Sequence, residues 1–271
     1  MNKLNRGIIL LLSLIAMCMI SSSVLAHTLW INVTDFTPAI GNKNIAKTKI
    51  YMGWGHHFPV DSYVKASDFN NLFIVTPTDE KRDIVLETEG FAAKELTLTN
   101  PGLHIVGAIR KEAWNTSYKE NGKLVHIKGT KEGHSNIVSS IFSQQFAKSL
   151  INVGDGPQNN LSKVLGHKLE IIPLTNPYTI VNNRGGVMKV KVLFDGKPLL
   201  FNKVYAMYEG YSVDDMASSA VSTDRQGIAS LRIDHWGKWV VKTKVNLPAR
   251  QLLKDKVNEE NYFASLTFLV P

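Results

Sequence analysis

The chain has 271 residues, of which 44% are hydrophobic and 20% are charged, and its formal net charge is +8. This length allows one large or two ordinary domains. Its basic residues are scattered as pairs, such as Lys81-Arg82 and Arg110-Lys111, and form no stripe interleaved with aromatic side chains, so nucleic-acid binding is disfavoured.

Residues 1–26 have the order of charged, apolar and small residues that is typical of a secretory signal peptide. The apolar run over residues 8–20 is shorter than the roughly 20 residues that a membrane-spanning helix needs. We expect cleavage after Ala26, with cleavage after Ser23 as the alternative. The processed protein is then expected to be periplasmic and not integral to the membrane.

The only cysteine, Cys18, lies inside the apolar run and follows Met17, whereas lipidation needs a small residue at that position. Cleavage would remove it. The processed chain would then have no thiol, which excludes disulfides, thiolate catalysis and cysteine-ligated metal clusters. Any metal site must use nitrogen and oxygen ligands.

Six strand-like segments follow the signal peptide. Each is short, β-branched or alternating, and bounded by Gly, Pro, Asn or Asp, which is typical of strands. Together they predict a β-sandwich. The segments cover residues 27–33, 47–53, 72–76, 84–88, 95–99 and 103–110.

Residues 137–150 predict one helix, because apolar side chains recur along them at three- and four-residue spacing. Ser135 or Asn136 would cap its start. The segment over residues 153–160 is polar and rich in Gly, Pro and Asn, with no periodicity. We therefore expect a domain boundary at residue 160 or just beyond, close to the helix.

The remaining residues predict a second, smaller sandwich, in which the turns Asp195-Gly196 and Asp224 to Gly227 separate strands. The predicted fold is mostly β, with two sandwich domains over residues 27–160 and 161–271. The expected strands of the second domain cover residues 168–173, 186–194, 203–208, 228–233, 238–245 and 262–270.

Eight histidines are present, and any one of them is more often a hydrogen-bonded or surface residue than a ligand. His27 differs, because cleavage after Ala26 would make it the first residue. Its α-amine, with an ordinary pKa of about 7.7–8.0, and its ring could then chelate one metal ion. The alternative is that cleavage must leave some residue first, and that histidine stands there by chance.

His56 and His57 are the candidates for completing such a site. Adjacent residues on a strand point to opposite faces, but Gly55 and Pro59 bracket this pair as a loop at a strand end, where both rings could turn inward. Exposure of both rings without a ligand is the alternative. The predicted metal ligands are therefore His27, His56 and His57.

Enzymatic chemistry has little support in the sequence. It contains no Gly-x-Ser-x-Gly elbow, His-Glu-x-x-His motif or Gly-rich phosphate loop. Glu170 and the nearby His167 could form a pair that binds a metal ion or supports its ligands. Equally, Glu170 could be the outward residue of a strand. We expect a protein that is not an enzyme and has no catalytic residues.

Seven motifs, in the same order and over nearly all of the processed chain, resemble the NikM-like family, which long carried a label of unknown function. They are HTLW at 27–30, GHHFP at 55–59, FAKSL at 146–150, LGHKLEIIPLTNPY at 165–178, VLFDGKPL at 192–199, TDRQG at 223–227 and GKW at 237–239.

The resemblance implies a periplasmic component of nickel or cobalt transport that presents Ni(II) or Co(II) to a membrane importer or outer-membrane receptor. His27 matches the family's histidine after cleavage, and His56 matches its Gly-His motif. His57 falls on a variable position, so its inclusion rests on the loop alone. The C-terminal half also looks like immunoglobulin-like or transthyretin-like modules.

Two other functions remain open. Amine and imidazole nitrogens also suit Cu(II), which the Irving–Williams order favours, so a copper-binding histidine brace is one alternative. The other is an adhesion or carbohydrate-binding sandwich without metal. In that case exposed tryptophans among Trp30, Trp54, Trp114, Trp236 and Trp239 would stack on sugar rings.

Overall fold

The computed structural model describes residues 27–62, 64–86, 90–180, 185–212 and 216–271. The predicted signal peptide, residues 1–26 with Cys18, lies outside these ranges. Within them the chain is mostly β, as predicted. No helix of the described ranges is long and apolar enough to cross a membrane. The helical segments there are single 3-10 turns: η1 (Asn42–Asn44), η2 (Ala66–Asp68), η3 (Pro177–Thr179) and η5 (Gln251–Leu253).

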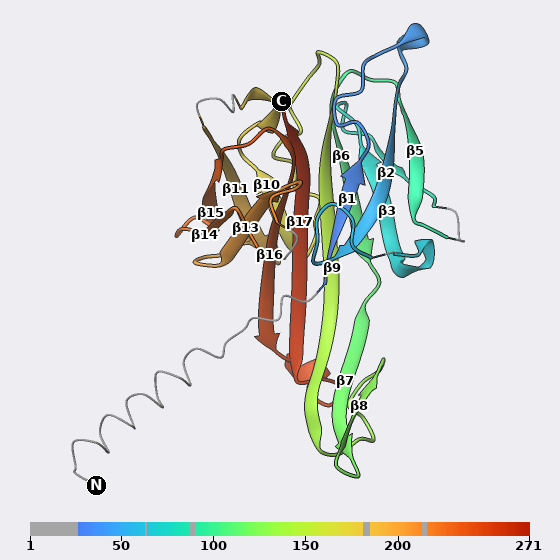
Figure 1. Ribbon diagram of the computed structural model, residues 1–271, viewed down its shortest axis with the longest axis vertical. Coiled ribbons are helices and arrows are strands. Elements are labelled where there is room, and N and C mark those ends of the chain that lie inside the picture. Colours follow the sequence, from blue (N-terminus) through green and yellow to red (C-terminus); the bar gives the residue numbers. More distant parts are fainter. Residues whose placement is uncertain (1–26, 63, 87–89, 181–184, 213–215) are drawn as a thin grey trace, which may run out of the picture.

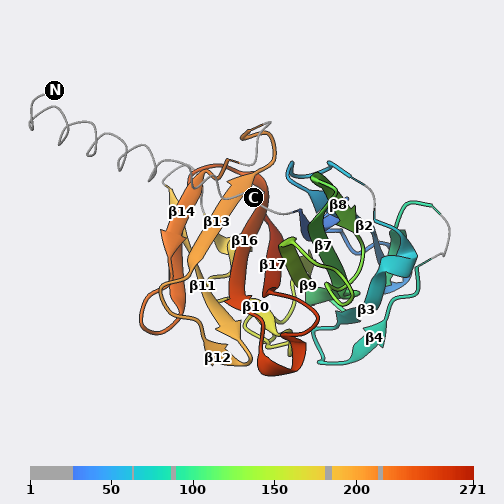
Figure 2. The same cartoon turned by 90° about the horizontal axis from the view of Figure 1, so that it is seen from below.

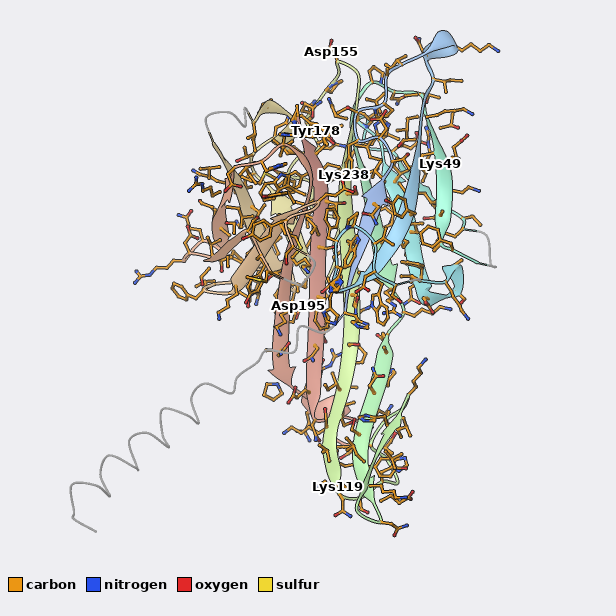
Figure 3. All side chains as sticks on the ribbon, viewed as in Figure 1. Lys49, Lys119, Asp155, Tyr178, Asp195 and Lys238 are labelled. Atoms are coloured by element: carbon orange, nitrogen blue, oxygen red, sulfur yellow. The ribbon has the colours of Figure 1, made fainter. Side chains whose placement is uncertain are left out.

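A ten-stranded main sheet runs through the described part of the molecule in the order β14-β13-β16-β17-β9-β6-β3-β4, and β7 and β8 extend it beside β9. Figure 1 shows β7 and β8 at the lower end of the long axis, and Lys119 marks that end in Figure 3. The strands are β3 (Phe69–Val75), β4 (Lys81–Asp83), β6 (Gly102–Arg110), β7 (Ala113–Glu120), β8 (Lys123–Ile127), β9 (Ile137–Val153), β13 (Lys203–Tyr208), β14 (Ser219–Ser222), β16 (Gly237–Pro248) and β17 (Glu259–Val270).

Two smaller sheets pack on the main sheet. One has the order β1-β2-β5, and in the other β10, β11 and β12 follow one another while β15 pairs with β11. Figure 2 shows them on opposite sides of the main sheet. Their strands are β1 (Thr28–Val33), β2 (Ala46–Gly55), β5 (Ala93–Leu98), β10 (Leu169–Pro173), β11 (Gly186–Phe194), β12 (Lys197–Pro198) and β15 (Ile228–Ile233).

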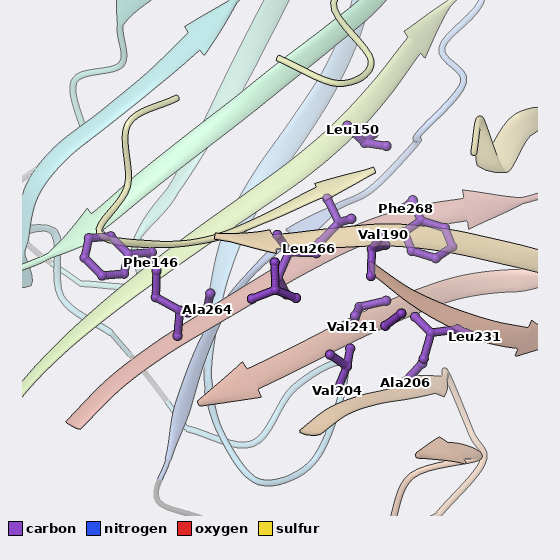
Figure 4. Close-up of a cluster of buried hydrophobic side chains, with 14 of the residues drawn as sticks. Phe146, Leu150, Val190, Val204, Ala206, Leu231, Val241, Ala264, Leu266 and Phe268 are labelled. Atoms are coloured by element: carbon purple, nitrogen blue, oxygen red, sulfur yellow. The ribbon is translucent and has the colours of Figure 1, made fainter. Parts of the chain in front are cut away.

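The side chains of β9 show how one strand serves both cores. Phe146 and Leu150 point to the larger core, which lies against β10, β11 and β15 (Figure 4). Ala147 and Ile151 point the other way, into the core beneath β1, β2 and β5. Because successive residues of a strand face opposite sides, the central part of β9 is buried on both faces.

The predicted helix over residues 137–150 is wrong, because these residues form most of strand β9. Phe142, Phe146 and Leu150 are four residues apart, a spacing that places them on one face of a strand as well as of a helix. The alternation of apolar and polar residues that marks a strand is interrupted at Lys148. This polar residue lies on the same buried face and forms an ion pair with Glu170 at 2.8 Å. The 17-residue strand is also far longer than typical strands.

Most other predicted strands are confirmed to within a few residues, and two differences stand out. The segment predicted over residues 84–88 is wrong in its described part, because residues 84–86 follow β4 outside any strand. Sequence analysis did not predict five further strands, which are short or polar: β4, β7, β8, β12 and β14. The predicted turn at Asp195-Gly196 is confirmed, and its two residues have positive φ values of 49° and 73°.

The domain boundary expected near residue 160 would divide strands that belong to one continuous sheet. β17 pairs in parallel with β9, so strands from both predicted domains are neighbours. The larger core likewise combines Leu103 and Phe146 with Val190 and Leu266. The division into domains 27–160 and 161–271 stays a prediction. The shared sheet and core weigh against separate folding of residues 161–271, since that fragment would expose apolar surface now covered by β9.

Two buried histidines make stability depend on pH. Burial lowers the pKa of His104 from 6.5 to about 4, and burial together with Lys148 lowers that of His167 from 6.5 to about 3. Both rings are neutral in the folded protein near neutral pH, whereas unfolding lets them protonate below about 6.5. The contribution of the two neutral rings to the free energy of unfolding is therefore complete above about pH 6.5. It is lost as the pH falls towards the pKa values of the folded state.

We expect the free energy of unfolding to fall between about pH 7 and pH 5, approaching about 1.4 kcal/mol per pH unit for each ring once the pH is below 6.5. Urea titrations at the two pH values measure this. The His104→Gln variant should lose part of the dependence. An unchanged difference between the two pH values in this variant would contradict the assignment.

Candidate metal centre

The pairing of β1 with β2 places His27 opposite His56. The antiparallel register joins Thr28 to Gly55, so the preceding and following residues, His27 and His56, are next in line. Side chains opposite each other in such a pair lie close together. The two imidazole rings meet edge to face, with centroids 4.5 Å apart and planes at 76°. Strand register thus brings together two residues that are far apart in the sequence.

Hydrogen bonds and apolar packing hold the loop over residues 56–62 against the rest of the protein. The carbonyl of Pro59 accepts hydrogen bonds from Trp30 Nε1 and Asn32 Nδ2, both at 2.8 Å. Phe58 is buried and packs with Trp30 in a small apolar cluster. These contacts hold the loop that carries His56 before any ligand arrives, which lowers the entropic cost of binding.

Asp61 holds the backbone of the two loop histidines. Its Oδ2 accepts hydrogen bonds from the backbone N–H of His56 at 2.6 Å and of His57 at 3.3 Å. The His56 N–H above all keeps the pKa of Asp61 below its ordinary value. Gly55 permits this arrangement, because its φ of +141° disfavours other residues and a Cβ there would overlap the Asp61 carboxylate.

We expect Asp61→Ala to weaken metal binding without removing a ligand. Outer-shell hydrogen bonds orient ligands, and their loss typically costs about 10–100-fold in metal affinity. Calorimetric titration with Ni(II) measures the effect. Asp83→Ala, which removes another exposed carboxylate on β4, is the matched control. Equal affinities of the two variants would show that Asp61 does not position His56.

His27 lies at the start of β1 on a defined support. Its carbonyl accepts a hydrogen bond from Gln145 Nε2 at 2.9 Å, and its ring contacts the Trp54 ring edge to face at 4.2 Å. Burial, followed by the nearby His56, lowers the pKa of the His27 ring, while Asp61 acts in the opposite direction. A lowered pKa favours the neutral imidazole, which is the form that binds metal.

Of the other three candidates, His57 lies near His56, whereas Glu170 and His167 do not. His57 is exposed in the same loop as His56, and the backbone N–H groups of both histidines donate to Asp61. Glu170 is buried with Lys148 in the larger core, and it also accepts the backbone N–H of Leu165 at 2.6 Å. His167 stacks on Phe146 in that same core. Glu170 and His167 therefore lie on the face of the main sheet opposite β1.

Within the described ranges, no group of three or more His, Cys, Asp or Glu side chains has a metal-binding arrangement. A site that uses the α-amine needs only two imidazoles, and His27 and His56 supply them at close range. The residues present thus fit a nitrogen-donor site in a chain that starts at His27, in which the amine would be the third donor.

Sequence reasoning missed Asp61, Gln145 and Arg110 as parts of this region. Arg110 lies over the Trp54 ring, with its guanidinium carbon 4.5 Å from the ring centroid. The carboxylate of Asp61, a few residues after a His-His pair, is the one local signal that could have been read. Gln145 and Arg110 come near His27 only through the sheet, so local sequence carries no signal for them.

The comparisons with known proteins bear on fold and family. Two solved structures resemble parts of the chain weakly: the "D0-D1 domain of Intimin" with 13% identity over 88% of this chain and 97% of that one at a TM-score of 0.23, and the "D00-D0 domain of Intimin" with 14% identity over 89% and 99% at 0.20. Scores this low carry no conclusion about function. No curated protein matches.

The family comparison is more informative, because it spans most of the chain. A single family model matches residues 24–246, a range that includes His27, the histidine loop and all strands from β1 to β15. The chain therefore belongs to the family described as a domain of unknown function (DUF4198).

Proposed function

We propose that the chain is an exported, periplasmic protein that binds a transition metal ion, Ni(II) or Co(II), for uptake. The α-amine and ring of His27 and the ring of His56 would hold the ion. The observation that carries the proposal is the 4.5 Å approach of these two rings, at the residue that the expected cleavage would make the first of the chain.

The donor set explains the choice of metal class. Amine and imidazole nitrogens suit Ni(II), Co(II), Cu(II) and Zn(II), whereas Mg(II) and Ca(II) prefer oxygen. Cu(II) would bind the same donors more tightly by the Irving–Williams order, so selection for nickel or cobalt would rest on supply and on site geometry. The fixed loop and the Gln145 hydrogen bond to His27 support a defined geometry.

Transfer to a partner requires a site that another protein can reach. His27 and His57 are exposed, and His56 is half-buried. A membrane importer or an outer-membrane receptor could therefore receive the ion without unfolding of the core. His57, next to His56, is the third predicted ligand and would be the first imidazole available to an incoming or leaving ion.

Mass spectrometry of protein recovered from the periplasm, together with its metal content, tests this function. We expect a chain that begins at His27, carries about one equivalent of Ni(II) or Co(II), and loses thermal stability when a chelator removes the ion. Stoichiometric Cu(II) instead would favour the copper-binding alternative. Two results would contradict the proposal: a chain with an intact Met1, or a melting temperature that neither the chelator nor the metal changes. Either result would favour an adhesion or carbohydrate-binding role.

A further inference from the structure

An open groove of about 480 Å³ begins at His27 and runs along the main sheet. It lies where β1 begins: β9 and β17 continue beyond the first residue of β1, so β1 does not cover their shared face there (Figure 1). Ser143, Gln145 and Asn261 contribute to its floor. The volume falls within the roughly 300–1,000 Å³ range of small-molecule sites.

The walls of the groove combine cations with aromatic rings. Trp54 and Trp114 are half-buried along it, and Arg110 and Lys128 line it as well. Among the described residues of the lining, Glu112 is the one carboxylate, so positive charge is in excess there. A small anion with some apolar surface is the ligand class that such walls favour.

Arg110 is a guanidinium that is held in place by an aromatic ring. Its side chain lies over the Trp54 ring and is only 19% exposed. It forms an ion pair with Asp68 at 3.8 Å, which is beyond hydrogen-bond distance. A half-buried guanidinium presents donors in a planar fork that matches a carboxylate. Arg110 is therefore positioned to receive a carboxylate from a ligand in the groove.

Two buried amides in the floor lack partners for their oxygens. Gln145 is 7% exposed and Asn261 is 9% exposed, and in the described part of the chain neither Gln145 Oε1 nor Asn261 Oδ1 has a hydrogen-bond partner. Unpaired buried acceptors are costly. A small rotation of either amide towards the groove would let its oxygen accept from a ligand hydroxyl or amine.

We propose that this groove binds a small carboxylate that carries a hydroxyl or amine donor, and that the metal ion arrives as its complex with such a chelator. The inference rests on the proposed function in that the groove begins at His27. The carboxylate would meet Arg110 and Lys128, and its hydroxyl or amine would meet the floor amides. Oxygen and nitrogen atoms of the same chelator would complete the coordination that two imidazoles and one amine leave open.

Calorimetric titration of the processed protein with citrate, Ni(II) and the Ni(II)–citrate complex tests the inference. We expect metal-free citrate to bind weakly and Ni(II)–citrate to bind more tightly than either component. Arg110→Gln and Lys128→Gln should each weaken citrate and Ni(II)–citrate about tenfold or more, since each removes a charge-assisted contact. Affinity of Lys128→Gln for Ni(II) alone should stay within about twofold, because Lys128 lines the groove without supporting either imidazole.

Two controls match these variants. Arg232→Gln removes an exposed guanidinium that also has a carboxylate at 3.8 Å, and Lys123→Gln removes an exposed ammonium of β8; neither residue lines the groove, and neither change should alter citrate binding. Tricarballylate, which is citrate without its hydroxyl, should bind several-fold more weakly than citrate, because it offers no donor to the floor amides.

The outcomes separate this inference from the proposed function. Retained citrate binding in His27→Ala with loss of Ni(II) binding supports both. Citrate binding that depends on Arg110 and Lys128 in a protein that binds no Ni(II) supports the groove and removes the metal function. The inference fails if Ni(II)–citrate binds no more tightly than Ni(II) alone in a protein that binds Ni(II). It also fails if both groove variants bind citrate as the wild type does, or if tricarballylate binds as tightly as citrate.

Discussion

Replacing either His27 or His56 with Ala is expected to abolish tight Ni(II) binding. Each change removes a coordinating ring nitrogen, and the effect should exceed the roughly 10–100-fold cost of losing an outer-shell partner. The two variants should behave alike, because the rings are neighbours with centroids 4.5 Å apart. Calorimetric titration with Ni(II), Co(II) and Cu(II) at one pH near neutrality provides the comparison.

His126→Ala is the matched control for the loss of a ring. His126 is exposed on β8 and hydrogen-bonds Ser117 Oγ at 2.7 Å, and its loss should leave affinity for all three metals unchanged. His57→Ala measures whether the third predicted ligand takes part, and its exposed position leads us to expect a smaller effect than that of His56→Ala. Wild-type affinity in both His27→Ala and His56→Ala would remove the proposed site.

The second large effect is on stability: Lys148→Met should lower the free energy of unfolding by about 3–5 kcal/mol. Lys148 and Glu170 are 2% and 1% exposed and form an ion pair at 2.8 Å inside the larger core. Loss of the ammonium would leave the Glu170 carboxylate buried without its cation. Urea denaturation followed by circular dichroism measures the change.

Two comparisons isolate the buried charge as the cause. Lys47→Met breaks an ion pair with Glu95 whose side chains are 62% and 47% exposed, and such surface pairs contribute only about 0.2–1 kcal/mol. Adding Glu170→Gln to Lys148→Met should restore part of the lost stability, because the unpaired charge is gone while an acceptor for the Leu165 N–H remains. Equal costs for Lys148→Met and Lys47→Met would refute the account.

Most strands could be predicted from sequence because their apolar residues alternate or form short runs between turn residues. β11 (Gly186–Phe194), β13 and β15 match their predicted ranges, and Asp195-Gly196 marks the hairpin between β11 and β12. In such segments the local composition favours the same structure as the tertiary packing, and a strand can therefore be predicted from the sequence.

β9 could not be predicted because its environment, and not its local pattern, decides its structure. Its face towards the larger core contains Lys148, whose burial depends on Glu170 in another sheet. Its other face contains Ser149, which is buried under β1 although it is polar. Neither residue follows the rule of an apolar core face, so the alternation expected of a strand was lost and a helical spacing appeared in its place.

The candidate site was predicted in part for a similar reason. Export and a Gly-His-His loop pointed to His27 and His56 separately, but their contact follows from the β1–β2 register, which sequence alone does not fix. The supports of the site, Gln145 and Arg110, belong to β9 and β6 and reach it only in the folded chain. Long-range sheet pairing is thus the information that the sequence analysis lacked.

A single titration tests the central claim most directly: calorimetry with Ni(II) on the chain that begins at His27 and on the same chain with one alanine ahead of His27. The added residue keeps both imidazoles and every described contact, and it moves the terminal amine so that it no longer closes a chelate ring with the His27 side chain. The account predicts a loss of affinity comparable to that of His27→Ala. Equal Ni(II) affinities for the two chains would contradict it.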